Sequence, residues 1–244
     1  MNKVVLITGA ARRIGATLAR GLHAQGMTVV IHYRHSKQAA QTLSDELNQA
    51  CPRSAFMINA DLRDLNQCNS LITETIALTG QLNVLINNAS SFYPTPLETA
   101  TEENWNDLMS SNLKAPFFLS QAASVYLKKE QGCIINLIDI HAEKPLKNYS
   151  IYSIAKAGLN MLTLSLAREL GPNIRVNGIA PGSILPPEKE NSLSEEEYQT
   201  LIRRTALKRS GSPDDILKAV DYLIRADYVT GQVMAVDGGR SLFM

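Results

Sequence analysis

The sequence contains little cysteine and no excess of charge of either sign. Three cysteines, Cys51, Cys68 and Cys133, are spread over its 244 residues, which excludes a CxxC pair and a clustered metal site. Widely spaced cysteines of this kind are typical of reduced thiols in the cytoplasm. The 24 basic and 23 acidic residues leave a formal net charge of +1, so the chain lacks the basic field that recruits nucleic acid.

Long apolar runs are also missing. No apolar stretch approaches the roughly 18–20 residues that a membrane-spanning helix requires. The first apolar run, Val4–Ile7, is too short for the core of a signal peptide. Hydrophobic residues nevertheless make up 45% of the chain, which is ample for a buried core. We therefore expect a soluble cytoplasmic protein that binds neither membranes nor nucleic acid.

The sequence does contain a regular alternation of strand and helix patterns. Predicted strands cover residues 4–7, 28–33, 55–60, 82–87, 133–139, 174–180 and 233–236. Predicted helices cover residues 13–25, 101–129 and 152–170, and four more begin at Ser36, at Asp64 with Gln67 as a capping box, at Ser194 with Glu197 as a second box, and at Ser212-Pro213. This alternation over residues 1–244 predicts a single-domain α/β Rossmann fold, with a doubly wound seven-stranded parallel sheet and helices on both faces.

The first predicted strand runs into a glycine-containing turn, residues 8–15. Strand, glycine turn and helix start in this order are typical of a dinucleotide-binding site. Gly9 permits a tight turn, Gly15 lets the helix approach the strand, and the helix N-terminus is left to bind an anion. Arg12 and Arg13 lie in the first turn of that helix, where cations oppose the helix dipole. A bound anion such as a pyrophosphate explains their presence.

The second predicted strand ends in a basic turn, His32-Tyr33-Arg34-His35-Ser36. It lacks the carboxylate that an NAD-selective site places against the ribose 2′-hydroxyl. Arg34 or His35 is suited to a 2′-phosphate, with Tyr33 and Ser36 donating hydroxyl groups. The turn therefore predicts NADP(H) rather than NAD, and the alternative is a solvated turn that happens to be basic.

Other unusual polar segments also follow predicted strands. They are residue 61 and the segments 87–93, 139–141 and 181–187. Ligands of parallel sheets bind beyond the carboxyl ends of the strands, so this coincidence predicts one shared site. Three prolines and the absence of an apolar period make residues 181–193 a loop. We expect a substrate loop over about 181–206.

Tyr152 and Lys156 are one helical turn apart, on the same face of a predicted helix. An ordinary tyrosine, with a pKa near 10, exchanges protons poorly at neutral pH. A lysine cation beside it is expected to lower the pKa of Tyr152 and make proton exchange with a substrate feasible. Alone such a pair is usually a surface feature, but after a nucleotide-binding turn it indicates catalysis.

Three further residues are candidates because of their placement. Asp139 ends an apolar strand thirteen residues before the tyrosine, so it is either solvated at the rim or directed into the site. Asn112 lies within the predicted helix 101–129, where it bonds the backbone or holds a water. Phe92, beside Tyr93 in a proline-bounded loop, packs onto its own domain or stacks on a flat ligand.

Together these motifs resemble the short-chain dehydrogenase/reductase pattern over nearly the whole chain, through residues 8–15, 87–89, 112, 152, 156 and 181–182. Three features are similar to the pteridine reductases in particular. They are Arg13 at the usual middle-glycine position, segment 88–96, and Asp139 in place of the usual catalytic serine. The bacterial dihydromonapterin reductases are the nearest sister group. The basic turn differs in order, because Arg34 precedes His35 here whereas pteridine reductases commonly have histidine before arginine.

The resemblance implies NADPH-dependent reduction of dihydropterins, such as dihydrobiopterin or dihydromonapterin, to their tetrahydro forms. Fully oxidised pterins and dihydrofolate are further candidate substrates. Phe92 would form one wall of a sandwich, with the nicotinamide as the other and the pterin between them. Tyr152 would deliver a proton to a ring nitrogen, with Asp139 bonded to it or feeding the relay, and Lys156 would bind ribose. A homotetramer built through helices 101–129 and 152–170 is also implied.

The same resemblance implies sets of site residues and no metal. The catalytic set is Asn112, Asp139, Tyr152 and Lys156. The substrate-binding set is Arg13, Ser90, Phe92, Asp139 and Tyr152. The set that binds NADPH or NADP+, in which Asp61 and Leu62 lie against the adenine, is Gly9, Arg13, Ile14, Gly15, His32, Tyr33, Arg34, His35, Ser36, Asp61, Leu62, Asn88, Ala89, Ser90, Tyr152, Lys156, Pro181, Gly182 and Ser183.

Two other functions are weighed against this one. A carbonyl reductase of the same family, acting for example on 3-oxoacyl thioesters, is disfavoured by Asp139, because a carbonyl oxygen is best served by a neutral hydroxyl donor. A non-catalytic nucleotide sensor is disfavoured because Tyr152 and Lys156 are both present, although the fold alone does not exclude it.

Overall fold

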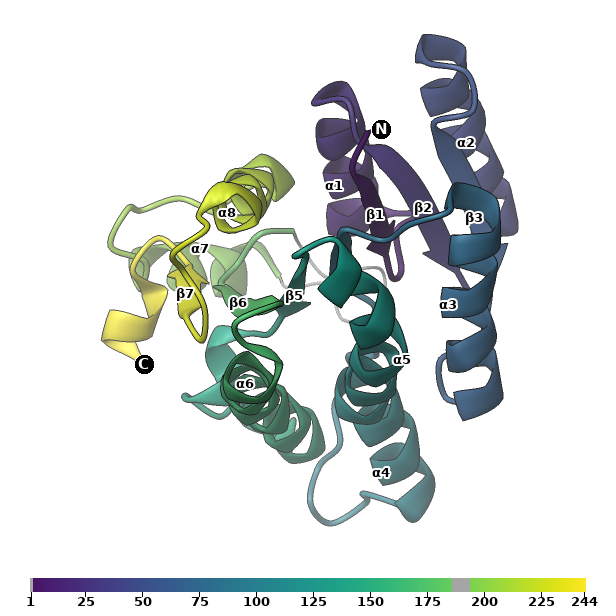
Figure 1. Cartoon of the computed structure of the whole chain (residues 1–244). Helices are drawn as coiled ribbons and strands as arrows, with labels where there is room; N and C mark the ends of the chain where they lie inside the picture. Colours follow the sequence, from purple (N-terminus) through teal and green to yellow (C-terminus); the bar gives the residue numbers. More distant parts are fainter. Residues whose placement is uncertain (1, 186–193) are drawn as a thin grey trace.

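Seven parallel strands form the centre of the protein, in the order β3-β2-β1-β4-β5-β6-β7 (Figure 1). The computed structural model describes residues 2–185 and 194–244. The strands are β1 Val4–Ile7, β2 Thr28–Tyr33, β3 Ala55–Asn59, β4 Val84–Asn87, β5 Cys133–Leu137, β6 Arg175–Pro181 and β7 Val233–Val236. The predicted seven-stranded parallel sheet is confirmed, although the predicted ranges 82–87 and 133–139 were each longer than the observed strand.

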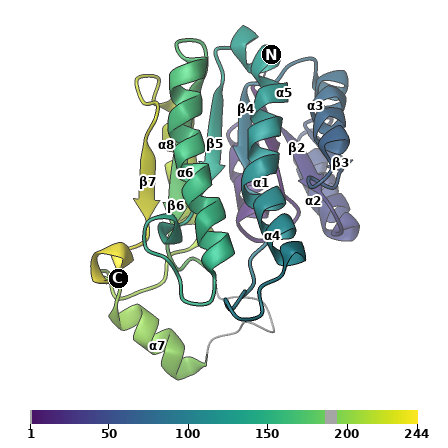
Figure 2. The same ribbon diagram turned by 90° about the horizontal axis from the view of Figure 1, so that it is seen from below.

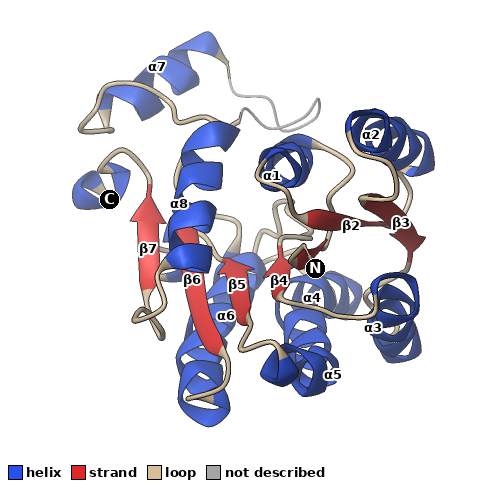
Figure 3. Ribbon diagram, turned by 45° about the horizontal axis from the view of Figure 1, so that its top comes forward, coloured by secondary structure: helices blue, strands red, loops and turns tan. Residues whose placement is uncertain are grey.

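Helices cover both faces of the sheet. They are α1 Arg13–Ala24, α2 Lys37–Ala50, α3 Leu65–Thr79, α4 Glu102–Met109, α5 Ala115–Lys129, α6 Ser150–Leu170, α7 Glu195–Arg203 and α8 Pro213–Arg225. One face carries α1, α2 and α8, and the other carries α3, α4, α5 and α6 (Figure 3). Helix α7 and the C-terminus lie beyond the carboxyl ends of the strands (Figure 2). Within the described ranges, no helix is both long and apolar enough to cross a membrane.

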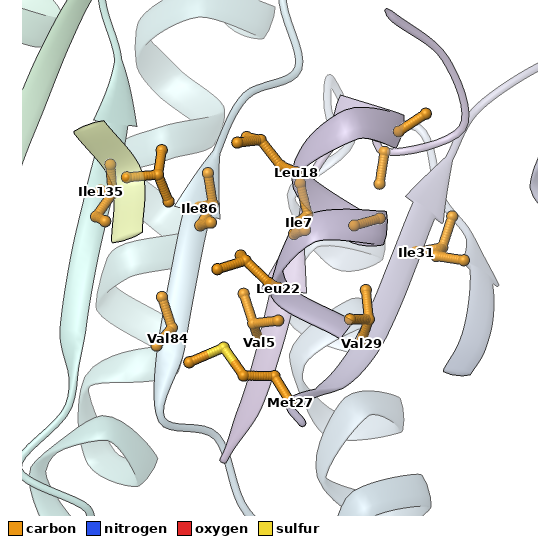
Figure 4. Packing of buried hydrophobic residues seen from close by; sticks show 14 of the residues in the cluster. Val5, Ile7, Leu18, Leu22, Met27, Val29, Ile31, Val84, Ile86 and Ile135 are labelled. Atoms are coloured by element: carbon orange, nitrogen blue, oxygen red, sulfur yellow. The ribbon is translucent and has the colours of Figure 1, made fainter. Parts of the chain in front are cut away.

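The core follows from the two-residue period of the strands. In β1, Val5 and Ile7 point toward α1 and pack with Leu18 and Leu22, whereas Leu6 belongs to the cluster on the opposite face (Figure 4). All five side chains are fully buried. Because helices cover both faces, β1 is apolar throughout rather than alternating. This packing fixes the end of β1, where the glycine turn begins.

The predicted helix 101–129 is present but is interrupted by a π-helical turn. Thr101 begins α4 with a capping box, in which Thr101 and Asn104 each accept a hydrogen bond from the other's backbone N–H. The segment Ser110–Lys114 is π-helical and joins α4 to α5. π-Helical turns are rare overall, and those that occur are frequently found at functional sites. This one contains Asn112.

Two of the predicted caps are confirmed and one is wrong. Ser194 and Glu197 form the predicted capping box of α7, and Pro213 is the first residue of α8. Asp64 does begin α3, where it accepts a hydrogen bond from the Asn66 N–H at 2.9 Å. Gln67 does not complete a box there, because its Oε1 accepts from the backbone N–H of Asp61 instead.

Candidate active site

The glycine turn after β1 requires its two glycines. Gly9 has a φ of +62°, and a Cβ on it would lie 3.0 Å from the Cα of Ala89. A Cβ on Gly15 would collide with the Gly9 carbonyl oxygen and would lie 2.8 Å from the Cα of Ala10. Arg13, at the usual middle-glycine position, keeps a left-handed φ of +53°. The turn is therefore too closely packed for a side chain at either glycine, and its bare backbone forms the glycine cradle of the site.

The N-terminus of α1 opens into this cradle. Arg12 occupies the N-cap position, and its side chain accepts no capping hydrogen bond. The first turn of α1, every residue of which is described, contains no acidic residue. The positive end of the helix dipole therefore faces the turn without a compensating acid, which favours an anion there.

His32 is buried beneath the turn, with 2% of its surface exposed. Its Nδ1 accepts a hydrogen bond from the Gly9 N–H at 3.0 Å, so Nε2 carries the proton and donates to the Ala60 carbonyl oxygen at 3.0 Å. Burial lowers the pKa of His32 to about 4, so the ring is neutral at pH 7. The sequence placed His32 among the cofactor-binding residues. In the structure both ring nitrogens form hydrogen bonds with the backbone, so the side chain supports the shape of the turn.

A cavity of about 390 Å³ gathers most of the predicted cofactor-binding residues. Those on its wall are Gly9, Arg13, Ile14, Gly15, His32, Tyr33, Arg34, His35, Ser36, Asp61, Leu62, Asn88, Ala89 and Ser90. The wall also contains residues absent from the predicted set, namely Ala11, Arg12, Ala60, Arg63, Ser91 and Ser111. Arg63 was missed even though it lies two residues beyond Asp61 at a strand end, which is the one signal that pointed to it.

The basic turn is joined to the end of β3. Arg34 Nε donates to His35 Nε2 at 2.8 Å, so His35 is an acceptor here. Arg34 Nη1 lies 3.9 Å from Asp61 Oδ1, while Arg63 bonds both oxygens of Asp61. The hydrogen bonds from Arg63 lower the pKa of Asp61 to about 2. Tyr33, whose hydroxyl was expected at a phosphate, is 7% exposed and packs in the core.

Next to this cavity, Tyr152 and Asp139 form a direct hydrogen bond. Tyr152 Oη donates to Asp139 Oδ2 at 2.8 Å, and the His141 N–H donates to Asp139 Oδ1 at 2.8 Å. Burial first, and the Asp139 carboxylate second, raise the pKa of Tyr152 well above its usual value. The expected lowering of this pKa by Lys156 is wrong, because the ring is 4% exposed and its nearest charge is an anion.

Lys156 is buried on the same helix. Its Nζ donates to the Leu137 carbonyl oxygen at 2.8 Å and lies 5.7 Å from the centroid of the Tyr152 ring. Burial lowers the pKa of Lys156 to about 8, and the Asp139 carboxylate opposes that shift. The ammonium is therefore cationic at neutral pH and close to losing its proton.

Asn112 is held beside the cavity wall by backbone carbonyl groups. Its Nδ2 donates to the carbonyl oxygens of Ser91 at 3.0 Å and Leu108 at 2.9 Å, and Ser91 lies on the cavity wall. Its Oδ1 is buried, and within the described part of the chain nothing donates to it. An unpaired buried oxygen of this kind is suited to an ordered water.

Phe92 lies at the opening of the site, 38% exposed. Its ring stacks on Tyr149, with centroids 4.7 Å apart and planes at 19°, and meets Tyr152 edge-on at 4.8 Å. Tyr149, which ends the loop before α6, was not among the predicted site residues. No pattern marked it, because the contact joins two loops that are distant in sequence.

Five predicted cofactor-binding residues lie apart from the cavity wall, namely Tyr152, Lys156 and the segment 181–183 at the end of β6. Pro181 ends β6, Gly182 donates its N–H to the Val236 carbonyl oxygen at 3.0 Å, and the Ser183 carbonyl oxygen accepts from Gly211 at 2.9 Å. They connect β6 to β7 and to the start of α8. Of the predicted substrate loop, residues 186–193 lie outside the described residues, and α7 occupies much of the remainder.

The sheet, the glycine cradle and the Tyr152–Lys156 pair define a class of protein. A family profile described as Enoyl-(Acyl carrier protein) reductase matches residues 9–241. The chain belongs to the short-chain dehydrogenase/reductase family and is by class an NAD(P)H-dependent oxidoreductase.

Two similar relatives carry different activities in their names. Pteridine reductase 1 of Leishmania tarentolae is 36% identical, over 98% of this chain and 96% of that protein. A 3-oxoacyl-(acyl carrier protein) reductase of Staphylococcus aureus is 34% identical, over 98% of each chain. Sequence identity alone therefore does not identify the substrate, which has to be inferred from the site.

Proposed function

We propose that this protein is an NADPH-dependent pteridine reductase that converts dihydropterins to tetrahydropterins. The observation that carries the proposal is the 2.8 Å hydrogen bond from Tyr152 to the Asp139 carboxylate. A carboxylate accepts hydrogen bonds and offers none, so it does not supply the second neutral donor that suits a carbonyl oxygen. It does suit a reaction in which Tyr152 alone protonates a ring nitrogen. The pteridine reductase among the relatives supports the same substrate class.

The cavity suits NADPH in shape and charge. Gly9 and Gly15 line the cavity with bare backbone, and the N-terminus of α1 with Arg13 would hold the pyrophosphate. Arg34, with His35 and Ser36, would hold the 2′-phosphate. When bound there, NADPH supplies the hydride for the reduction.

Tyr152 is the proton donor in this proposal. Its raised pKa keeps the phenol protonated at neutral pH but makes it a weaker acid, so proton transfer depends on a cation that stabilises the phenolate. The hydrogen bond to Asp139 holds the hydroxyl oxygen in place, and the O–H would turn from the carboxylate to the substrate nitrogen for the transfer. The Lys156 ammonium offsets the negative charge left on Tyr152 after transfer and would bind the ribose. Asn112, through its unpaired Oδ1, would hold a water that returns a proton to the site.

The pterin would stack on the exposed side of Phe92. Tyr149 covers the other face of that ring and supports it from behind. An aromatic sandwich of this type contributes roughly 0.5–1.5 kcal/mol beyond the buried area. Ser90 and Arg13 would contact the pterin edge, and residues 181–206 would form the substrate loop.

A homotetramer is proposed on the basis of exposed apolar side chains on α5 and α6. Val125 is 61% exposed and Met161 60%, and Phe117 and Leu164 are also exposed. Such a surface is typical of an interface between subunits. Met161→Glu should dissociate the assembly, as measured by light scattering, and an unchanged mass would contradict this interface. The proposed location is the cytoplasm.

The test is to follow NADPH oxidation by the purified protein with four candidate substrates. They are dihydrobiopterin, dihydromonapterin, dihydrofolate and an acetoacetyl thioester. Turnover of the pterins without the thioester is the expected result. Thioester turnover without pterin turnover would instead identify a 3-oxoacyl reductase, the activity named for the Staphylococcus aureus relative.

Asp139→Ser sharpens this test. It restores the neutral hydroxyl that a carbonyl substrate needs and removes the carboxylate. We expect pterin turnover to fall while thioester turnover stays the same or rises. Equal losses for both substrates would show that Asp139 does not select the substrate.

A further inference from the structure

An ion-pair cluster forms the wall of the cavity where β2 and β3 end. Arg63 Nε donates to Asp61 Oδ1 at 3.0 Å and to Oδ2 at 3.1 Å, and Nη2 donates to Oδ2 at 2.6 Å. The backbone N–H of Arg63 also donates to Oδ1 at 3.0 Å. Arg63 thus bonds both oxygens of the Asp61 carboxylate with a bidentate fork.

Asp61 also lies close to the arginine proposed to bind the 2′-phosphate. Its Oδ1 is 3.9 Å from Arg34 Nη1, and the nearer partner of Arg34 is His35. A carboxylate at this wall competes with a phosphate for Arg34 and repels it directly. An Asp61 carboxylate without Arg63 would therefore weaken the binding of NADP(H) and spare NAD(H), which lacks the 2′-phosphate.

Arg63 is itself held from a second side. Its Nη1 lies 3.4 Å from Asp107 Oδ1 on α4, and Tyr93 Oη donates to Asp107 Oδ2 at 3.1 Å. Because Asp107 also draws the guanidinium, Arg63 is placed between two acids and beside the cavity. Arg63 thereby engages both oxygens of Asp61, whereas Arg34 approaches that carboxylate only to 3.9 Å and keeps its guanidinium available to an anion.

We propose that Arg63 determines the preference for NADP(H), by holding Asp61 so that Arg34 is available to the 2′-phosphate. The inference rests on the proposed use of NADPH. It identifies Arg63 as a specificity-determining residue that acts through Asp61. It also explains how a cavity that contains an aspartate accommodates a phosphate.

The experiment measures binding of NADP+ and of NAD+ by calorimetry, without a pterin present. Arg63→Ala should weaken NADP+ binding by about tenfold or more, the scale of one hydrogen bond to a charged group. NAD+ binding should stay the same or become tighter, which also shows that the variant is folded. In Asp61→Ala/Arg63→Ala, the NADP+ to NAD+ affinity ratio should return toward that of the unmodified protein.

Arg20→Ala is the matched control. Arg20 forms a similar bidentate pair with Glu46, at 2.8 Å and 2.7 Å, away from the cavity wall. This control should leave both affinities unchanged.

Three results would overturn the role of Arg63. The first is an unchanged NADP+ to NAD+ affinity ratio in Arg63→Ala, and the second is an equal loss of affinity for both dinucleotides. The third is a double variant whose affinity ratio stays as low as that of Arg63→Ala. The last result would mean that Arg63 binds the phosphate directly. The ratio in the unmodified protein tests the proposed use of NADPH separately, so the two ideas fail on different measurements.

Discussion

The cofactor cavity and the group around Tyr152 are neighbouring regions built in different ways. The cradle of the cavity is made of backbone, because Gly9 and Gly15 have no side chains there and the start of α1 presents the positive end of its dipole to an anion. The reaction site is made of side chains from separate elements, Asp139 after β5 and Tyr152 on α6. Substitutions in the cavity should therefore change binding and stability, whereas those in the reaction site should change the rate.

The largest effect is expected at Tyr152. Tyr152→Phe removes the only proposed acid and keeps the ring, so turnover should fall by roughly 10²–10⁴-fold. NADP+ binding by calorimetry should stay close to normal, because the cradle is untouched. Tyr126→Phe on α5 is the control for loss of a hydroxyl and should keep full turnover. Near-normal turnover in Tyr152→Phe would eliminate it as the acid.

The next largest effect concerns stability in acid, and it belongs to the cavity. His32 has a pKa of about 4 when folded, below the 6.5 of an ordinary histidine. The unfolded chain therefore binds a proton first as pH falls. This difference in proton binding lowers the free energy of unfolding progressively between about pH 6.5 and pH 4, by on the order of 3 kcal/mol in total, and levels off below pH 4.

Asn in place of His32 removes this titration while keeping an amide that can bond the turn. The free energy of unfolding of His32→Asn, from urea titrations at several pH values, should fall less steeply below pH 6.5. It should also be lower than that of the unmodified protein at pH 7, by about 1–3 kcal/mol. His35→Asn is the exposed control. Identical pH slopes for His32→Asn and the unmodified protein would rule out this account of acid sensitivity.

The same contrast explains which features the sequence predicted. Strands, helices and the glycine cradle follow from local patterns, because apolar periodicity and glycine placement act within a few residues. The sheet order then brought the segments after β1, β2, β3 and β4 to one cavity, as their shared position at strand ends predicted. The excess length given to β4 and β5 has a simple cause, since an apolar residue beyond a strand end is still buried.

Contacts between distant side chains were not predictable in this way. The stack of Tyr149 on Phe92 and the pair of Arg63 with Asp107 on α4 depend on how distant segments meet in space. The sign of the Tyr152 pKa shift failed for a related reason. Spacing placed Lys156 beside the ring, but burial and an anion in direct contact outweigh a cation 5.7 Å from its centroid.

A smaller effect on rate should come from the charge of Lys156. This amine is cationic below its pKa of about 8 and neutral above it. The turnover number should therefore fall as pH rises through about 8, approaching tenfold per pH unit if the cation is required. Lys156→Arg stays cationic over this range, so any activity that it keeps should lose this alkaline decline. A flat profile through pH 8 for the unmodified protein would show that the charge of Lys156 is not needed.

The smallest effect is expected at Phe92, where the two regions meet. Phe92→Ala removes the proposed stacking wall, so the dissociation constant of dihydrobiopterin should rise about two- to tenfold, which corresponds to 0.5–1.5 kcal/mol. NADP+ affinity should change less, because Phe92 is not on the wall of the cofactor cavity. Phe92→Leu keeps apolar bulk without the aromatic face, so it separates stacking from simple burial. Equal losses of pterin and NADP+ affinity in Phe92→Ala would mean that the ring only packs its loop against Tyr149 and Tyr152, and that the wall of the pterin site lies elsewhere.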